Sequence, residues 1–111
     1  MAGKFVITKG RDDKYYFNLK AGNGEIILTS QGYTAKSDCL NGIESVKTNA
    51  AHDNRFECKK SNDGKEYFVL TASNGQTIGK SQMYKSAGSC SNGMKSVTSN
   101  AADASTIDES E

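Results

Sequence analysis

The chain has 111 residues, with 14 basic and 13 acidic side chains and a formal net charge of +1. This length fits one domain, and so balanced a charge argues against binding to nucleic acid or membranes through the overall field of the protein. No apolar run is long enough to span a bilayer, and the N-terminus lacks a signal-peptide pattern. The sequence therefore predicts one soluble cytoplasmic domain over residues 1–111.

The sequence repeats itself without a gap at a period of 51 residues, which takes Phe17 to Phe68 and Tyr33 to Tyr84. Other identical pairs are Tyr16 and Tyr67, Asn23 and Asn74, Asn41 and Asn92, and Ser45 and Ser96. Such repetition predicts two copies of one structural unit, residues 4–54 and 55–104, followed by a short strand and acidic tail over 105–111. Each half is too small to bury a sufficient core alone, so we expect one shared core.

Each repeat begins with three short stretches in which apolar and polar residues alternate, as in strands with one buried face. The expected inward residues are Phe5, Ile7, Phe17, Leu19 and Ile27, and then Phe56, Cys58, Phe68, Leu70 and Ile78. Asp-rich and Asn-Gly turns separate the stretches, because these residues accept the positive φ angles of tight hairpins. Each repeat should therefore start as a three-stranded meander.

Helical spacing replaces alternation after Tyr33 and Tyr84. Apolar residues then recur at i, i+4, i+7 and i+11, namely Cys39, Ile43, Val46 and Ala50, and Cys90, Met94, Val97 and Ala101. This stripe predicts helices near residues 37–49 and 88–100 that pack on the sheet. Gly42 and Gly93 lie on it although glycine costs a helix about 1 kcal/mol relative to alanine, which indicates close approach of helix and sheet.

One further period beyond Phe56 falls on Ile107, so residues 106–108 are expected to form a strand that buries Ile107. The predicted fold is α+β. Two tandem β3-α(-β) repeats form one antiparallel sheet, with both helices on one face and exchanged terminal strands.

The side chains that most often perform catalysis or bind metals have ordinary explanations here. Cys39, Cys58 and Cys90 lack metal-ligand spacing and all fall on inward positions, which predicts three buried, unbridged thiols. His52, the single histidine, stands in the connection between the repeats, where an exposed linker residue is the simplest interpretation. We therefore predict no catalytic residue, no metal, no cofactor and no enzymatic activity.

Two doubled motifs, Asn-Gly followed by a β-rich segment and Asn-Gly-x-x-Ser-Val in the helix, identify a family resemblance. They read Asn23-Gly24-Glu25-Ile26-Ile27 and Asn74-Gly75-Gln76-Thr77-Ile78, then Asn41-Gly42-Ile43-x-Ser45-Val46 and Asn92-Gly93-Met94-x-Ser96-Val97. Together with Tyr33 and Tyr84 these motifs resemble the bacterial YegP-like tandem-repeat family over nearly the whole chain. The resemblance implies a β3-α-β repeat with exchanged terminal strands. It implies no function, because this family has none assigned.

The outward face of the sheet is the predicted binding surface. Its nominated residues are Tyr16, Lys20, Ile26 and Leu28 in the first repeat, and Tyr67 and Val69 in the second. The first repeat is the more apolar there, and an exposed apolar patch usually marks a contact surface. We thus expect a module that binds an unknown protein partner or itself. Ordinary strand propensity is the alternative explanation of the same residues.

Two further interpretations stay open. A single-stranded nucleic acid could stack on Tyr16 and Tyr67 while lysines meet its phosphates, although the near-neutral charge disfavours this. Asn41 and Asn92 recur within the helices, off the apolar stripe, where asparagine is mildly unfavourable. Their amides are expected either to hold the loop that enters the helix or to contact a ligand.

Overall fold

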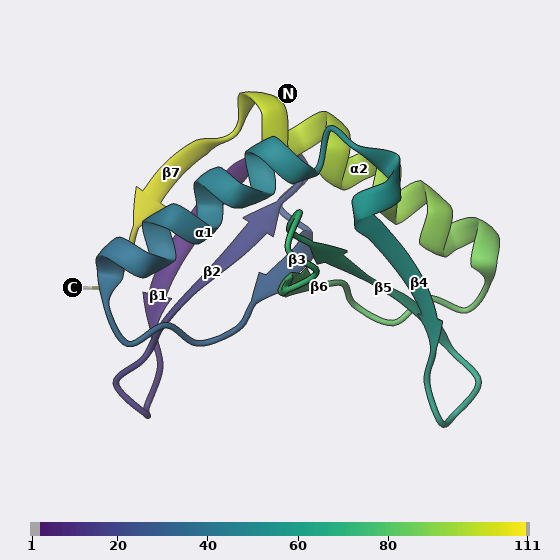
Figure 1. Ribbon diagram of the computed structural model, residues 1–111, viewed down its shortest axis with the longest axis horizontal. Coiled ribbons are helices and arrows are strands. Elements are labelled where there is room, and N and C mark those ends of the chain that lie inside the picture. Colours follow the sequence, from purple (N-terminus) through teal and green to yellow (C-terminus); the bar gives the residue numbers. More distant parts are fainter. Residues whose placement is uncertain (1–2, 111) are drawn as a thin grey trace.

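The computed structural model describes residues 3–110 as one curved sheet with two helices on the same face (Figure 1). The first repeat supplies β1 (Lys4–Lys9), β2 (Tyr15–Lys20), β3 (Ile26–Ser30) and α1 (Lys36–Asn49). After a 3₁₀ turn (Asp53–Arg55) come β4 (Phe56–Lys60), β5 (Glu66–Thr71), β6 (Thr77–Lys80), α2 (Ala87–Asp103) and β7 (Ser105–Asp108). The predicted helices and α+β class are confirmed.

The strand order is β4-β5-β6-β3-β2-β1-β7, so β7 of the second repeat lies beside β1 of the first. This confirms an exchanged terminal strand. The sheet is not antiparallel throughout, however, because β7 pairs with β1 in parallel. β1 and β7 are separated by the rest of both repeats, and α2 carries the chain from β6 at the centre of the sheet to β7 at its edge.

The register of β7 corrects the expected burial of Ile107. Ile107 pairs with Val6, whereas Thr106 pairs with Phe5. Paired residues point to the same face, so Ile107 lies on the outer face next to Val6 and is 37% exposed. The buried apolar residue at the start of this strand is Ala104, at 6%.

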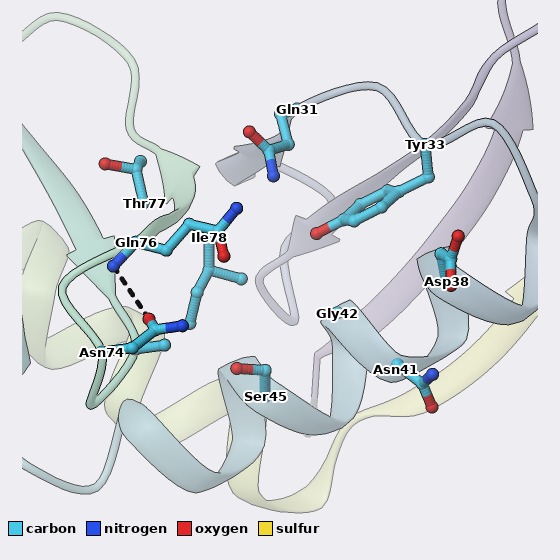
Figure 2. A pocket seen from close by; sticks show the side chains of 11 residues that line it. Gln31, Tyr33, Asp38, Asn41, Gly42, Ser45, Asn74, Gln76, Thr77 and Ile78 are labelled. Carbon is cyan, nitrogen blue, oxygen red and sulfur yellow. Dashed lines mark hydrogen bonds between the residues drawn. The ribbon is translucent and has the colours of Figure 1, made fainter.

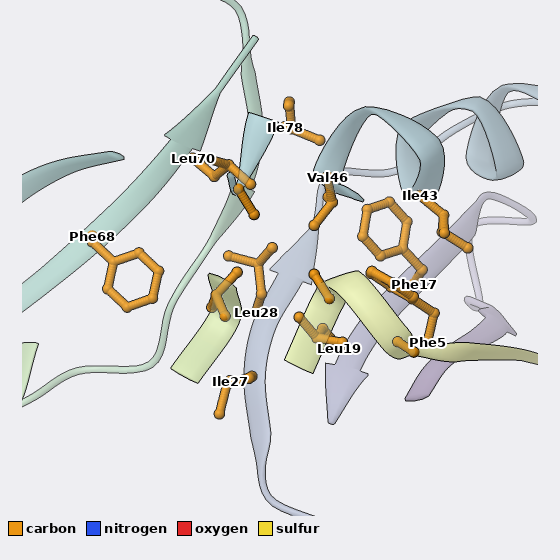
Figure 3. Packing of buried hydrophobic residues seen from close by; sticks show 14 of the residues in the cluster. Phe5, Phe17, Leu19, Ile27, Leu28, Ile43, Val46, Phe68, Leu70 and Ile78 are labelled. Atoms are coloured by element: carbon orange, nitrogen blue, oxygen red, sulfur yellow. The ribbon is translucent and has the colours of Figure 1, made fainter. Parts of the chain in front are cut away.

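A β-bulge changes the predicted facing of the third strand. Leu19 pairs with Leu28 and Lys20 with Ile26, so β3 carries one extra residue, Ile27. Alternation fails across a bulge, and both Ile27 and Leu28 enter the core (Figure 3). The prediction that Leu28 lies on the outer face is wrong, since this side chain is fully buried.

The two repeats meet at the β3–β6 pair, where Thr29 pairs with Lys80, its own repeat equivalent. A pseudo-twofold axis therefore passes through the centre of the sheet. Around it, 17 of the described residues, from both repeats, form one continuous apolar cluster, as expected for two halves that share a core.

The cysteine prediction is confirmed for two thiols and wrong for the third. Cys39 and Cys90 are fully buried, whereas Cys58 is exposed on β4. Cys58 occupies an inward position, but β4 is an edge strand and no neighbouring strand shields its outer side within residues 3–110.

Among residues 3–110, no helix is long and apolar enough to cross a bilayer.

Candidate binding clefts

The residues nominated on the outer sheet face differ widely in exposure. Leu28 lies in the core and Val69 is only 7% exposed. Ile26 is 41% exposed and remains the one nominated aliphatic residue that is open to contact. Lys20, like the two tyrosines, is partly buried. The broad apolar patch expected from the first repeat is thus reduced to Ile26.

Tyr16 and Tyr67 lie on that face, but each already has an intramolecular partner. The Tyr16 hydroxyl donates a hydrogen bond to Asp12 Oδ2 at 2.7 Å. This bond is the main reason that the pKa of Asp12 is lowered and that of Tyr16 is raised. The Lys80 Nζ lies 4.8 Å from the centre of the Tyr67 ring. A base that stacked on Tyr67 would have to displace this lysine.

Two clefts on the helix side of the sheet bring together residues that both repeats share. Cleft 1, of about 440 Å³, is lined by Gln31, Tyr33, Asp38, Asn41, Gly42, Ser45, Ala72, Asn74, Gln76, Thr77 and Ile78 (Figure 2). Cleft 2, of about 420 Å³, is lined by Ala21, Asn23, Glu25, Ile27, Gln82, Tyr84, Ser89, Asn92, Gly93 and Ser96. Each cleft combines the helix of one repeat with the Asn-Gly hairpin of the other. The pseudo-twofold axis relates the two.

A glycine in each helix makes room for the cleft tyrosine. A Cβ built on Gly42 would lie 2.5 Å from the Tyr33 hydroxyl oxygen and 3.0 Å from Phe17 Cε2, so a larger residue would displace the Tyr33 ring. Tyr33 stacks on Phe17 with ring centroids 6.3 Å apart and an interplanar angle of 13°. Figure 2 shows its hydroxyl directed into the space between Gln31 and Gln76. Burial is the main cause of the raised pKa of Tyr33.

The second repeat reproduces this arrangement. A Cβ built on Gly93 would clash with the Tyr84 hydroxyl. Tyr84 stacks on Phe68 with ring centroids 6.2 Å apart and an interplanar angle of 13°. Burial likewise raises the pKa of Tyr84. The close approach of helix and sheet predicted from the two glycines is confirmed, and its purpose in the fold is to seat a tyrosine.

The Asn-Gly hairpins form the opposite wall of each cleft. Gly75 has a φ of +84°, in the left-handed region that glycine adopts most easily. Asn74 Oδ1 accepts the backbone N–H of Gln76 at 3.0 Å, and Asn23 does the same for Glu25. These turns hold residues 76 and 25 at equivalent places in the two clefts.

Hydroxyl and amide groups complete the lining. The Asn49 amide donates to the carbonyl oxygen of Ser45 at 2.8 Å and to its Oγ at 3.1 Å. Asn100 repeats both contacts with Ser96. Each serine oxygen therefore already accepts a hydrogen bond, and its hydroxyl proton stays available to donate into the cleft.

Asn41 and Asn92 line the two clefts, and their amides form no hydrogen bond to another group among residues 3–110. The expectation that they hold the loop before the helix is therefore wrong. Both residues are exposed, and the other alternative, that their amides contact a ligand, stays a prediction.

The clefts differ in two charged positions. Cleft 1 has Asp38 where cleft 2 has Ser89, and cleft 2 has Glu25 where cleft 1 has Gln76. In cleft 2 the Gln82 amide donates to Glu25 Oε1 at 2.8 Å. Each cleft thus contains one carboxylate and, among the described lining residues, no basic side chain.

Sequence reasoning identified single members of this site but not the site itself. Asn41 and Asn92 stood out because they recur without a packing role. Gln31 and Gln82 also recur in both repeats, and this recurrence could have marked them as site residues. It was not noticed because each follows a serine whose recurrence has a structural reason. Ser30 Oγ accepts the Phe17 N–H at 2.9 Å and donates to the carbonyl of Gln31 at 2.8 Å.

Comparison with known proteins identifies relatives over the whole chain. The model of a domain of unknown function, DUF1508, matches twice, at residues 11–57 and 61–108. UPF0339 protein PA0329 of Pseudomonas aeruginosa is 49% identical and covers 99% of this chain and 100% of its own. UPF0339 protein YegP of Escherichia coli is also 49% identical, over 90% of this chain and 91% of its own.

Solved structures agree with this result. The solution NMR structure of yegP from E. coli, described as a protein of unknown function, superposes with a TM-score of 0.94 at 45% identity. That match covers 99% of this chain and 95% of the other. UPF0339 protein SO3888 from Shewanella oneidensis gives a TM-score of 0.92 at 45% identity, covering 99% and 93%. With its two DUF1508 repeats, the chain therefore belongs to the UPF0339 family of YegP-like proteins.

Proposed function

We propose that this protein is a non-catalytic module that binds a protein partner, or a second copy of itself, through the two clefts. The observation that carries this proposal is the convergence of the doubled residues. Tyrosine, glutamine, asparagine and serine side chains that both repeats retain meet at two equivalent sites, each built from both repeats.

The chemistry of the lining supports an uncharged polar segment of polypeptide as the ligand. Amides and hydroxyls both donate and accept hydrogen bonds, which suits backbone amides and neutral polar side chains. The floor is apolar, with Ile78 in cleft 1 and Ile27 in cleft 2. A phosphate group would meet a carboxylate and no basic residue there, which disfavours nucleic acid in the clefts.

Binding without catalysis fits the placement of the reactive side chains. The two cleft carboxylates, Asp38 and Glu25, stand at different positions of the repeat, so the shared feature is the neutral set rather than an acid or base. His52 is exposed between α1 and β4 and lines neither cleft.

The proposal also assigns the protein to the cytoplasm. Its three free cysteines support this, because thiols stay reduced in that compartment.

The exposed Ile26 connects this proposal with the outer sheet face. It lies between Glu25 and Ile27, both of which line cleft 2. A partner in cleft 2 could reach Ile26 at its rim. The partly buried Tyr16, Lys20 and Tyr67 would then be secondary contacts, and the buried Val69 would support the strand beneath them.

Affinity capture with paired variants tests the proposal. Asn41→Arg with Asn92→Arg places a long cation in each cleft without removing an intramolecular hydrogen bond. The matched control is Ala51→Arg with Ala102→Arg, which are exposed, equivalent positions outside the clefts. We expect a partner retained from the native cytoplasm, or a dimer seen by sedimentation, to persist in the control and to be lost in the cleft variant.

Equal retention by both variants would contradict binding through the clefts. A retained component that is nucleic acid, released as salt rises, would instead favour the alternative function. If the wild-type protein retains nothing and stays monomeric, the protein-partner proposal fails.

A further inference from the structure

The pseudo-twofold symmetry that relates the two repeats is broken at the two edges of the sheet. β7 covers the outer edge of β1, whereas the equivalent edge of β4 has no strand beside it within residues 3–110. In Figure 1, β7 lies beside β1 and α1 on one side of the molecule, and β4 and α2 form the opposite side. The fold therefore shows a strand in place at one edge and its vacant counterpart at the other.

Equivalent residues differ in burial as expected if a strand were missing. Phe5 is fully buried, but Phe56 is only partly buried. Ile7 is 1% exposed, whereas its equivalent Cys58 is exposed. These residues share one face of their strands, and Phe56 and Cys58, the less buried pair, belong to the edge without a neighbour.

A groove of about 340 Å³ marks the vacant place between β4 and α2. It is lined by Phe56, Ser91, Met94, Lys95, Thr98 and Ser99. The repeat equivalents are Phe5, Leu40, Ile43, Glu44, Lys47 and Thr48, and β7 lies along the corresponding side of β1. There Asp108 of β7 reaches across to α1 and pairs with Lys36 Nζ at 2.7 Å.

We propose that the β4 edge and this groove bind an extended, acidic segment of a partner protein, which adds to the sheet parallel to β4. Backbone hydrogen bonds would hold it, as in other cases of strand addition. In the first repeat the Glu109 N–H donates to the Ile7 carbonyl at 2.8 Å. The equivalent carbonyl on β4 is that of Cys58.

Charge at the vacant edge favours an acidic segment. Lys59 and Lys60 lie on β4 and Lys95 on α2, while Glu57 is the one acidic residue of β4. The chain's own β7 segment has the required character, because it carries Asp108 and Glu109 and adopts an extended conformation beside the equivalent edge. This site is separate from the two clefts and does not depend on the function proposed for them.

A synthetic peptide with the sequence of residues 104–111 is the probe, added to the intact labelled protein and followed by NMR. We expect saturable amide shifts at 56–60 and 91–99. A spin label on the peptide N-terminus should broaden Arg55 more than Lys60, because Ser105 lies beside Lys4 and Asp108 beside Ile7 in the parallel arrangement. A control peptide that differs only by proline in place of its isoleucine should not bind, since proline lacks a backbone N–H.

Paired variants locate the contact. Ser91→Trp fills the groove and should abolish the shifts, whereas Leu40→Trp makes a bulky change at the equivalent position of α1 and should leave them intact. Lys95→Glu should weaken binding roughly two- to fivefold, the range of an exposed ion pair, and Lys14→Glu on the other repeat should not.

Several outcomes would overturn the proposal. The first is that the proline peptide causes the same amide shifts as the peptide of residues 104–111. The second is that the shifts are confined to β1, which would mean that the peptide displaces β7. The third is that Ser91→Trp leaves the shifts unchanged. Concentration-dependent broadening of 56–60 without peptide would show that a second copy occupies this edge instead.

Discussion

At the residue scale, Leu28 and Gly79 show how two similar repeats are made to fit one core. They are repeat equivalents that flank the pseudo-twofold axis, and a Cβ on Gly79 would lie 2.9 Å from Leu28 Cγ. There is room for one large side chain near the axis and not for two. Sequence identity between the repeats is therefore lost where their equivalent residues approach each other.

Gly79→Ala should destabilise the protein by about 1 to 3 kcal/mol, the usual effect of overpacking a core. Leu28→Ala alone should cost about 2 to 5 kcal/mol by leaving a cavity. Because the new methyl group would fill part of that cavity, the double variant should be more stable than the sum of the two losses predicts. Urea unfolding of all four proteins measures this coupling, and strict additivity would contradict the contact.

The three thiols should differ sharply in reactivity. Burial raises the pKa of Cys39 to about 11 and that of Cys90 to about 12, so little thiolate forms at neutral pH. Cys58 is exposed, with its Sγ 3.3 Å from that of Cys90. Alkylation followed by mass spectrometry should modify Cys58 first, and modification of Cys39 at the same rate would contradict its burial.

At the scale of elements, β7 is held by its backbone pairing and one ion pair rather than by a large buried side chain. Ile107 is partly exposed, and only Ala104 is buried at its start. Four residue pairs join it to β1, and Glu109 extends the ladder. The strand closes an edge that would otherwise be open to other chains.

Deletion of residues 104–111 should therefore lower the free energy of unfolding by roughly 2 to 4 kcal/mol, from several backbone hydrogen bonds of about 1 kcal/mol each. Ile107→Ala should cost much less, about 1 kcal/mol or under, because its side chain is partly exposed in the folded protein. Denaturant unfolding gives both values. An equal loss for the two variants would mean that Ile107 is buried after all.

The ion pair of β7 predicts a pH dependence. The hydrogen bond from Lys36, followed by bonds from Ser110, lowers the pKa of Asp108 to about 2. A carboxyl group whose folded pKa lies below its unfolded value near 3.8 contributes stability above pH 4, and this contribution is lost as pH falls toward 2. The stability difference between wild type and Asp108→Asn should accordingly shrink over that window. A difference that persists unchanged at pH 2 would exclude the ion pair as its source.

At the scale of the whole molecule, the two repeats complete each other. Each cleft takes a helix from one repeat and a hairpin from the other, and β7 of the second repeat pairs with β1 of the first. The apolar cluster is likewise continuous across β3 and β6. Within residues 3–110, no boundary separates two independent cores.

The separated halves, residues 1–53 and 54–111, should each lack cooperative thermal unfolding and dispersed NMR spectra, because neither can bury enough apolar surface alone. Mixing them should restore both properties. The intact chain should unfold in a single transition. A folded first half in isolation would contradict a shared core.

The repeat period and the apolar spacing by themselves determined the strands, both helices and the exchange of a terminal strand, because local periodicity records which face of each element is buried. Periodicity could not show the bulge that turns Leu28 inward, the register that leaves Ile107 outward, or the exposure of Cys58 at an edge. Those depend on which strands become neighbours. The clefts were also beyond the sequence, because Asn41 and Gln76 meet only after one repeat packs against the other. Tertiary structure decided the two clefts, since they are formed by contacts between repeats that no single segment encodes.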